Sequence, residues 1–98
     1  MIYLDLANWK TATGWCVDAD GKEDGRGNTT KGFTKETCFA LCEKSFDFNG
    51  CTFDLTDASG KCITYTGDIV GGNNNAAYEC FYRSGTQMNF RKIKLFDF

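Results

Sequence analysis

The chain of 98 residues contains six cysteines and no histidine, and this combination limits its possible folds more than any other feature. An even number of cysteines in a short chain is typical of a disulfide framework, which persists only in an oxidising compartment. We therefore expect a secreted or cell-surface protein. A zinc site is not expected, because Cys38 and Cys42 have the wrong spacing for a zinc knuckle and no histidine partner.

The composition favours one small domain that binds neither nucleic acid nor a cofactor. The aromatic residues, nine Phe, four Tyr and two Trp, supply core material, which disulfides supplement in a chain of this size. The net charge of −2 is mild, and basic residues are dispersed apart from a short group at residues 91–94. The expected single domain, residues 1–98, comprises a disulfide core at 14–83, an N-terminal strand arm at 1–13 and a C-terminal strand arm at 84–98.

The sequence predicts no membrane span, since no hydrophobic run approaches the ~18 residues that cross a bilayer. Residues 1–6 do not resemble a signal peptide, because they lack a basic start and Asp5 interrupts the apolar stretch. We expect the chain to be a mature form or an excised domain.

One helix is predicted at residues 34–46. Thr34 is a suitable N-cap, and Glu36 places an acid near the positive end of the helix. Cysteines and apolar residues recur at spacings of three and four, which predicts one buried stripe. Its members are Cys38, Leu41, Cys42 and Phe46, with Phe39 widening it.

Residues 51–56 and 61–66 predict a β-hairpin across a turn at residues 57–60. The first strand alternates between two faces, which is typical of a half-buried strand. One face carries Cys51, Phe53 and Leu55, and the other carries Thr52, Asp54 and Thr56.

Further strands are predicted at residues 1–6, 76–83 and 90–98, and polar surface loops at 18–32 and 71–75. In the strand at 76–83, Tyr78, Cys80 and Tyr82 share one side. Together these elements predict an antiparallel α+β domain, a small disulfide-rich fold with one helix packed on a sheet.

The positions of the cysteines favour one nested pairing. Cys38 and Cys42 share one helix face, so each is expected to reach a neighbouring element. Cys51 follows Cys42 closely, and Cys62 lies on the strand paired with that of Cys51. The predicted pairs are Cys16–Cys80, Cys38–Cys62 and Cys42–Cys51.

Five stretches together resemble the PAN/apple domain family over residues 14–83. They are Gly14-Trp15-Cys16-Val17-Asp18, Phe33-Thr34-x-x-x-Cys38-x-x-Leu41-Cys42, Cys51-Thr52-Phe53-Asp54, Gly60-Lys61-Cys62-Ile63-Thr64-Tyr65 and Tyr78-Glu79-Cys80-Phe81-Tyr82. The resemblance implies an extracellular module with a curled antiparallel sheet cradling one helix. It also implies that the module binds proteins or carbohydrates and is not catalytic. The two arms depart from the family pattern.

A sugar site is one interpretation of the aromatic and amide residues, since such sites place aromatic faces beside amides. Its candidate residues are Trp15, Tyr65, Tyr78, Asn73 and Asn75, with Asn74 between the last two. The alternative is that the aromatic residues fill the core and the asparagines form a turn.

Two tripeptides resemble N-glycosylation signals. Asn28-Thr29-Thr30 is an Asn-x-Thr sequon in a predicted surface loop, and Asn28 is the candidate attachment site. Asn49-Gly50-Cys51 has the rare Asn-x-Cys form, and we expect little use of it if Cys51 is bridged.

No catalytic residue is expected, because the absence of histidine removes the usual Ser-His and Cys-His pairs. The acids Asp18, Asp20, Glu23 and Asp24 lie in the polar loop, where they suit solvation. Their spacing does not fit an EF-type calcium loop.

The two arms are apolar and strand-forming, so they are candidates for strand addition between copies of the chain. The alternative is that both arms extend the sheet of their own subunit. The residues expected to take part in self-association are Ile2, Leu4, Leu6, Ile93, Leu95, Phe96 and Phe98.

These observations predict a non-enzymatic extracellular module that binds a protein, a carbohydrate or copies of itself. A second hypothesis is a glycosylated subunit of an extracellular filament, assembled through the terminal strands. A third hypothesis is a small secreted inhibitor of another protein.

Overall fold

The computed structural model describes residues 9–83, and the predicted hairpin forms the centre of the fold. β4 (Gly50–Asp54) pairs antiparallel with β5 (Cys62–Tyr65). The turn between them needs glycine at position 60, because a φ of +70° is unfavourable for other residues and a Cβ there would collide with the Phe33 backbone. The strands predicted at 1–6 and 90–98 lie outside the described residues.

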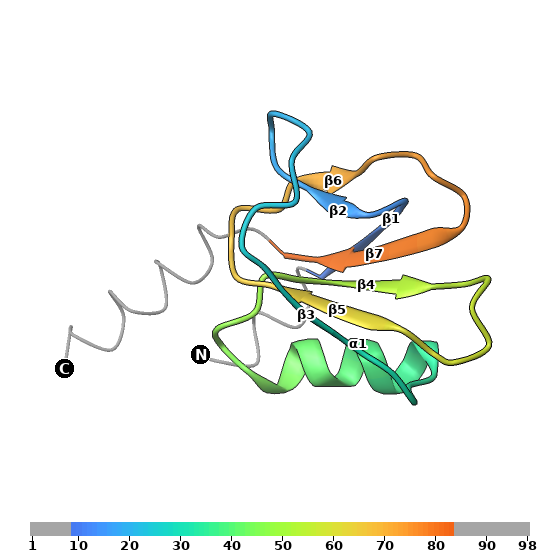
Figure 1. The fold of residues 1–98 in the computed structure, drawn as a ribbon. Coiled ribbons are helices and arrows are strands. Elements are labelled where there is room, and N and C mark those ends of the chain that lie inside the picture. Colours follow the sequence, from blue (N-terminus) through green and yellow to red (C-terminus); the bar gives the residue numbers. More distant parts are fainter. Residues whose placement is uncertain (1–8, 84–98) are drawn as a thin grey trace, which may run out of the picture.

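Strands on both sides of this hairpin complete a five-stranded antiparallel sheet in the order β1-β7-β4-β5-β3 (Figure 1). β7 (Tyr78–Tyr82) lies beside β4, with β1 (Lys10–Thr13) beyond it, and β3 (Arg26–Thr30) lies beside β5. A second, two-stranded sheet consists of β2 (Cys16–Val17) and β6 (Gly71–Gly72). With one helix on the large sheet, the chain forms the α+β domain that the sequence predicted.

α1 (Lys35–Lys44) is the predicted helix, and it packs on one face of the large sheet (Figure 1). Thr34 is its N-cap, as predicted. The Thr34 hydroxyl accepts from the Thr37 N–H at 3.1 Å, and the Thr37 hydroxyl accepts from the Thr34 N–H at 2.8 Å. The helix is shorter than predicted because the chain is already extended at Ser45, which leaves Phe46 46% exposed and outside the buried stripe.

The core has one cluster on each face of the large sheet. The cluster beneath the helix consists of Cys38, Cys42, Cys51 and Cys62, packed with Trp9, Phe33, Phe39, Leu41, Phe48, Phe53 and Phe81. The opposite cluster consists of Cys16, Ile63, Tyr65, Ile69 and Cys80.

The prediction of a half-buried strand at residues 51–56 was wrong, because β4 has core clusters on both of its faces. Thr52, expected on the outer face, is completely buried, whereas Leu55, expected in the core, is 48% exposed beyond the end of the strand. The prediction failed because the β2–β6 sheet and its neighbouring loops cover the second face of β4. The alternation of polar and apolar residues along β4 does not reveal that cover.

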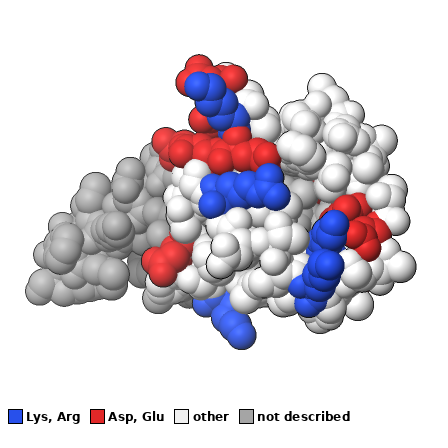
Figure 2. Space-filling model, in the orientation of Figure 1, with Lys and Arg blue, Asp and Glu red and all other residues white. Residues whose placement is uncertain are grey.

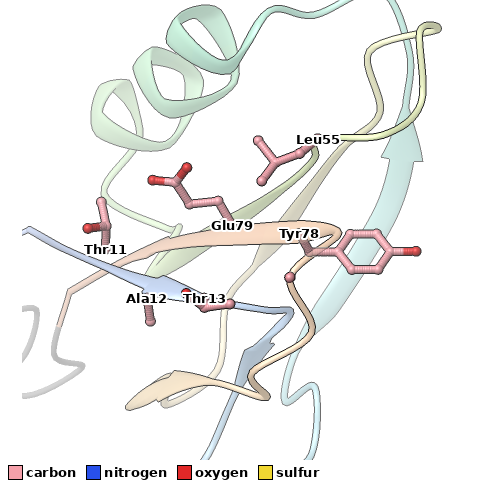
Figure 3. Close-up of a pocket in the computed structure, with 7 residues that line it drawn as sticks. Thr11, Ala12, Thr13, Leu55, Tyr78 and Glu79 are labelled. Carbon is pink, nitrogen blue, oxygen red and sulfur yellow. The ribbon is translucent and has the colours of Figure 1, made fainter.

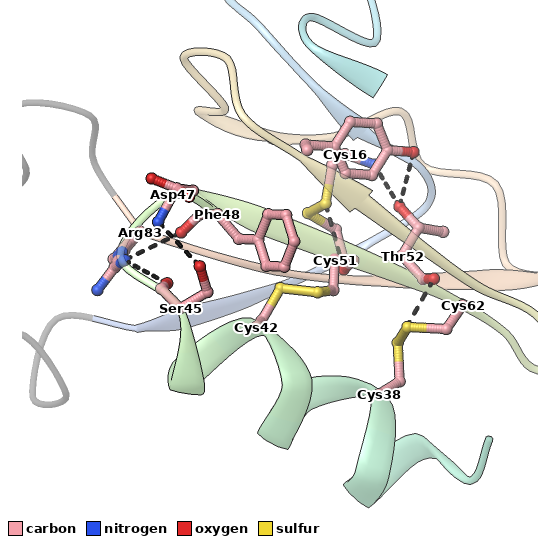
Figure 4. Close-up of a disulfide and its surroundings, with 12 residues drawn as sticks. Cys16, Cys38, Cys42, Ser45, Asp47, Phe48, Cys51, Thr52, Cys62 and Arg83 are labelled. Carbon is pink, nitrogen blue, oxygen red and sulfur yellow. Dashed lines mark hydrogen bonds between the residues drawn. A yellow bond between two sulfur atoms is a disulfide. The ribbon is translucent and has the colours of Figure 1, made fainter. Parts of the chain in front are cut away.

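The six cysteines form three disulfides, and the pairs are those of the nested scheme given above: Cys16–Cys80, Cys38–Cys62 and Cys42–Cys51. Two bridges tie α1 to the β4–β5 hairpin (Figure 4). The third bridge ties β2 to β7. All six half-cystines are fully buried. This framework indicates an oxidising environment.

Three short strands lie where the sequence predicted loops or an arm. β3 lies in the predicted loop at 18–32, β6 in the predicted loop at 71–75, and β1 in the N-terminal arm at 1–13. Each is polar or glycine-rich, so its composition is that of a loop. Each becomes a strand because the backbone groups of a neighbouring strand pair with it. The neighbour is β5 for β3, β2 for β6 and β7 for β1.

No helix within residues 9–83 has the length and hydrophobicity needed to cross a bilayer.

Candidate functional site

Tyr65 is part of the core and does not contribute to a binding surface. It is completely buried. Its hydroxyl donates to Glu23 Oε1 at 2.7 Å and accepts from the Thr52 hydroxyl at 3.1 Å. Thr52 Oγ1 also accepts from the Cys16 N–H at 3.0 Å (Figure 4). Burial, and then the bond to Glu23, raises the pKa of Tyr65 above the ordinary tyrosine value. For Tyr65, the core alternative is therefore correct.

The asparagines shape the turn between β6 and β7. Asn73 Oδ1 accepts from the N–H groups of Trp15 and Asn75, both at 3.0 Å. Asn75 Oδ1 accepts from the Ala77 N–H at 3.0 Å, and Asn74 adopts the left-handed conformation with φ +70°. The side-chain oxygens of Asn73 and Asn75 therefore support the backbone, as the turn alternative expected.

Trp15 and Tyr78 are the two predicted ligand residues that the fold brings together at the surface. Their rings meet edge to face, with centroids 5.1 Å apart and an interplanar angle of 74°. Both are partly exposed. They line a hollow of about 120 Å³ on the face of the large sheet opposite the helix. Its other lining residues are Arg26, Thr29, Asp54, Lys61 and Ile63.

The two cations of this smaller hollow already have acidic partners. Arg26 pairs with Glu23 at 3.1 Å, and Lys61 pairs with Asp57 at 3.0 Å. Hydrogen bonds from Ser59, and then Lys61, hold the pKa of Asp57 far below its usual range, and Asp57 raises the pKa of Lys61. With its cations neutralised locally, the smaller hollow suits an uncharged ligand better than an anion.

Asp54 supplies the acceptor of the smaller hollow. Its residue is 8% exposed, and its Oδ1 accepts from the N–H and the hydroxyl of Thr56 at 3.0 and 2.9 Å. No residue within 9–83 hydrogen-bonds to the second oxygen, Oδ2. A ligand hydroxyl that donates to Oδ2 would therefore satisfy a carboxylate that is already held in place.

A larger hollow of about 290 Å³ lies at the same end of the sheet and shares Tyr78 with the smaller one. Glu79 and Leu55 point to the helix side of the sheet, and Ala12 points to the other side (Figure 3). Glu79 also pairs with Lys35 at 3.2 Å. The full lining is Thr11, Ala12, Thr13, Leu55, Ala76, Tyr78 and Glu79. We refer to the two hollows, which share Tyr78 as a lining residue, as the Tyr78 surface.

Most lining residues of the Tyr78 surface were not predicted from the sequence. Asp54 pairs with Tyr78 in the β4–β7 register, which brings the acid to the aromatic ring. The predicted hairpin alone could not show this, because the register between β4 and β7 joins strands 24 positions apart. The sequence offered one indication of this position: the alternation along residues 51–56 places Asp54 on the strand face opposite Cys51.

Two carboxylates of the acidic loop at residues 18–24 accept hydrogen bonds from nearby backbone N–H groups and hold the loop in shape. Asp18 Oδ1 accepts from the N–H groups of Asp20 and Lys22, both at 2.9 Å, and Asp24 Oδ2 accepts from the Asp68 N–H at 3.2 Å. On the face shown in Figure 2, acidic and basic groups lie next to one another and most of the surface is uncharged. No single-sign patch dominates the described part of this face.

The sulfur atoms of Cys38, Cys51 and Cys62 lie within 4.8 Å of one another. All three belong to disulfides, so they lack the thiolate that a metal ion requires.

The remaining predicted residues have separate locations. Asn28 is exposed on β3. Residues Ile2, Leu4, Leu6, Ile93, Leu95, Phe96 and Phe98 lie outside the described residues.

Comparison with known proteins gave no match to a family model, to a curated protein or to a solved structure.

Proposed function

We propose that this protein is a non-enzymatic, extracellular binding module that resembles PAN/apple domains and holds a glycan on the Tyr78 surface. The resemblance of residues 14–83 to that family supports a secreted or cell-surface location, as do the three disulfides. The mixed, mild surface charge supports recognition by shape and hydrogen bonds over recognition of a strongly charged polymer.

The observation that carries the proposal is that Tyr78 lines two hollows whose walls combine polar and apolar groups. Sugar rings pack their C–H faces on aromatic rings and direct their hydroxyls to fixed acceptors. The Tyr78 surface offers both features, with Trp15 beside Tyr78 and Asp54 Oδ2 as an acceptor in the smaller hollow. A ligand that contacts both hollows must pass around the end of the sheet beside Tyr78, which suits two or more linked sugars.

The placement of the two carboxylates supports binding without hydrolysis. Asp54 pairs with Tyr78, and Glu79 is the next residue along β7, so the two acids lie on opposite faces of the sheet. A glycosidase needs two carboxyl groups on either side of one glycosidic bond. Asp54 and Glu79 do not have that arrangement, and Glu79 is already paired with Lys35.

A glycan array followed by calorimetry on the best hit tests the proposal. We expect saturable binding to neutral oligosaccharides, weakened about tenfold or more by Tyr78→Ala. Asp54→Asn should weaken binding less, because the amide still offers an oxygen. Val70→Ala, at a residue 57% exposed and outside both hollows, is the matched control and should bind as the wild type does. Absence of saturable binding, or equal affinity of the Tyr78 and Val70 variants, would contradict the proposal.

The apolar arms support a second candidate function, a structural subunit of an extracellular filament. This function predicts a polymer of high mass in sedimentation or light scattering. Deletion of residues 90–98 should then leave monomers, whereas the glycan-binding module should stay monomeric with or without those residues.

A further inference from the structure

β3 is an open edge of the large sheet. Within residues 9–83 its only strand partner is β5, and all five of its residues are exposed. The outer side of such a strand offers N–H and C=O groups that can pair with another chain. Soluble proteins with an edge of this kind usually carry a feature that blocks association.

One feature of β3 is a bulge that surrounds Asn28. Arg26 pairs with Tyr65 and Thr29 pairs with Ile63, so β3 has one more residue than β5 between the two pairs. Gly27 accommodates this irregularity, because a Cβ there would press against Thr64 Oγ1 at 3.0 Å. The extra residue disturbs the regular ladder where Asn28 stands.

The Asn28 side chain is free to accept a modification. No residue within 9–83 hydrogen-bonds to it, and it is exposed. Asn28-Thr29-Thr30 is the only Asn-x-Ser/Thr tripeptide in the sequence. Asn49, in the Asn-x-Cys tripeptide, differs in both respects: it is 6% exposed, and its amide donates to the carbonyls of Thr66 and Gly67 at 3.3 and 2.9 Å.

We propose that Asn28 carries an N-linked glycan and that this glycan closes the β3 edge against pairing with a second copy of the chain. The co-reactant is a lipid-linked oligosaccharyl diphosphate. Asn28 Nδ2 bonds to C1 of the first sugar and gives up one proton to a base of the transferase, while the C1–O bond breaks and the lipid diphosphate leaves with the electron pair. A sugar chain at the bulge occupies the space that an added strand would need.

This inference is independent of glycan binding by the Tyr78 surface. Arg26 and Thr29 line the smaller hollow, but Asn28 does not. Removal of the attached glycan therefore leaves every lining side chain unchanged, and the two proposals have separate measurements.

Secretion of the protein from eukaryotic cells, followed by intact-mass analysis, tests the attachment site. We expect one glycan on the wild type, on Thr30→Ser, which preserves the sequon, and on Thr29→Ala, which changes only its middle residue. Asn28→Gln and Thr30→Ala should lack the glycan. A wild-type protein secreted without a glycan, or a glycan that remains on Asn28→Gln, would overturn the assignment.

Light scattering during size exclusion tests the role at the edge. The glycosylated wild type should be monomeric, and Asn28→Gln should associate as its concentration rises. Asn28→Lys also lacks the sequon, but it places a charge on the edge strand and should stay monomeric. The edge role is wrong if Asn28→Gln is monomeric at every concentration, or if Asn28→Lys associates as strongly as Asn28→Gln.

Discussion

The guanidinium carbon of Arg83 lies 4.7 Å from the centre of the Trp9 ring. Trp9 stacks on Phe81 with centroids 4.5 Å apart, and Phe81 stacks on Phe39 of α1 at 4.3 Å. Arg83 also donates to the carbonyls of Ser45 and Phe48 at 3.2 and 3.0 Å, in the segment that follows the helix (Figure 4). This stack joins the two ends of the described chain to the helix.

Replacement of Arg83 by lysine tests the importance of that contact. Lysine keeps the charge but lacks the planar fork that reaches two carbonyls while lying on Trp9. Because Arg83 is 1% exposed, we expect Arg83→Lys to lower the free energy of unfolding in urea by about 2–3 kcal/mol. Arg26→Lys, at an exposed ion pair, is the matched control and should cost less than about 1 kcal/mol. Equal losses in the two variants would show that the guanidinium geometry is unimportant.

The ionisation of Tyr65 should lower the free energy of unfolding at alkaline pH. Its folded pKa is raised above the unfolded value of about 10, so its contribution is complete below pH 10 and is lost as the pH rises further. The stability difference between the wild type and Tyr65→Phe should therefore shrink above about pH 10. Guanidinium unfolding at several pH values measures this difference, and tyrosinate absorbance should show one fewer late-ionising group in the variant. A difference that is constant up to the alkaline unfolding transition would contradict the argument.

The protonation of Asp57 should lower the free energy of unfolding at acidic pH. Its folded pKa is lowered, so its stabilising contribution is complete at neutral pH and is lost as the pH falls below about 4. Asp57→Asn should be less stable than the wild type at pH 7, and the two proteins should converge in acid. Urea unfolding between neutral and acidic pH measures the gap. If the gap widens as the pH falls, the Ser59 and Lys61 contacts do not act on the ionised carboxylate.

The three disulfides should differ in their effect on stability. Cys16–Cys80 spans 64 residues of sequence and Cys42–Cys51 spans 9. On the chain-entropy model, the longer loop contributes about 4 kcal/mol and the shorter about 3 kcal/mol. Paired alanine replacement of Cys16 and Cys80 should therefore lower the Tm more than replacement of Cys42 and Cys51. Calorimetry with matched heating rates compares them, and the reverse order would show that local packing outweighs loop closure.

The parts of the fold that depend on local spacing were predictable from the sequence. Thr34 identified the start of the helix, and the spacing of Cys38 and Cys42 placed both on its buried face. The turn at residues 57–60 identified the hairpin. β1, β3 and β6 were not predictable, because their conformation depends on hydrogen bonds to strands distant in sequence and not on their own side chains.

The candidate site was predicted in part. Trp15 and Tyr78 were chosen as aromatic residues that could combine with the amides of residues 73–75, and the structure brings their rings together. Tyr65 was chosen for the same reason but is buried, because the β2–β6 side of the molecule covers its strand. Asp54 joins Tyr78 only through the β4–β7 register, which a single sequence without partners does not reveal.

The pairing of Lys10 with Tyr82 places the two ends of the described chain side by side. Mechanical tension applied through Trp9 and Arg83 would separate β1 from β7 one hydrogen bond at a time, beginning at the pair Lys10 and Tyr82. Opening would stop at the Cys16–Cys80 bridge, which would then carry the whole force through a covalent bond. Every residue from 17 to 79, including most of the Tyr78 surface, lies off that force path and would keep its shape under load.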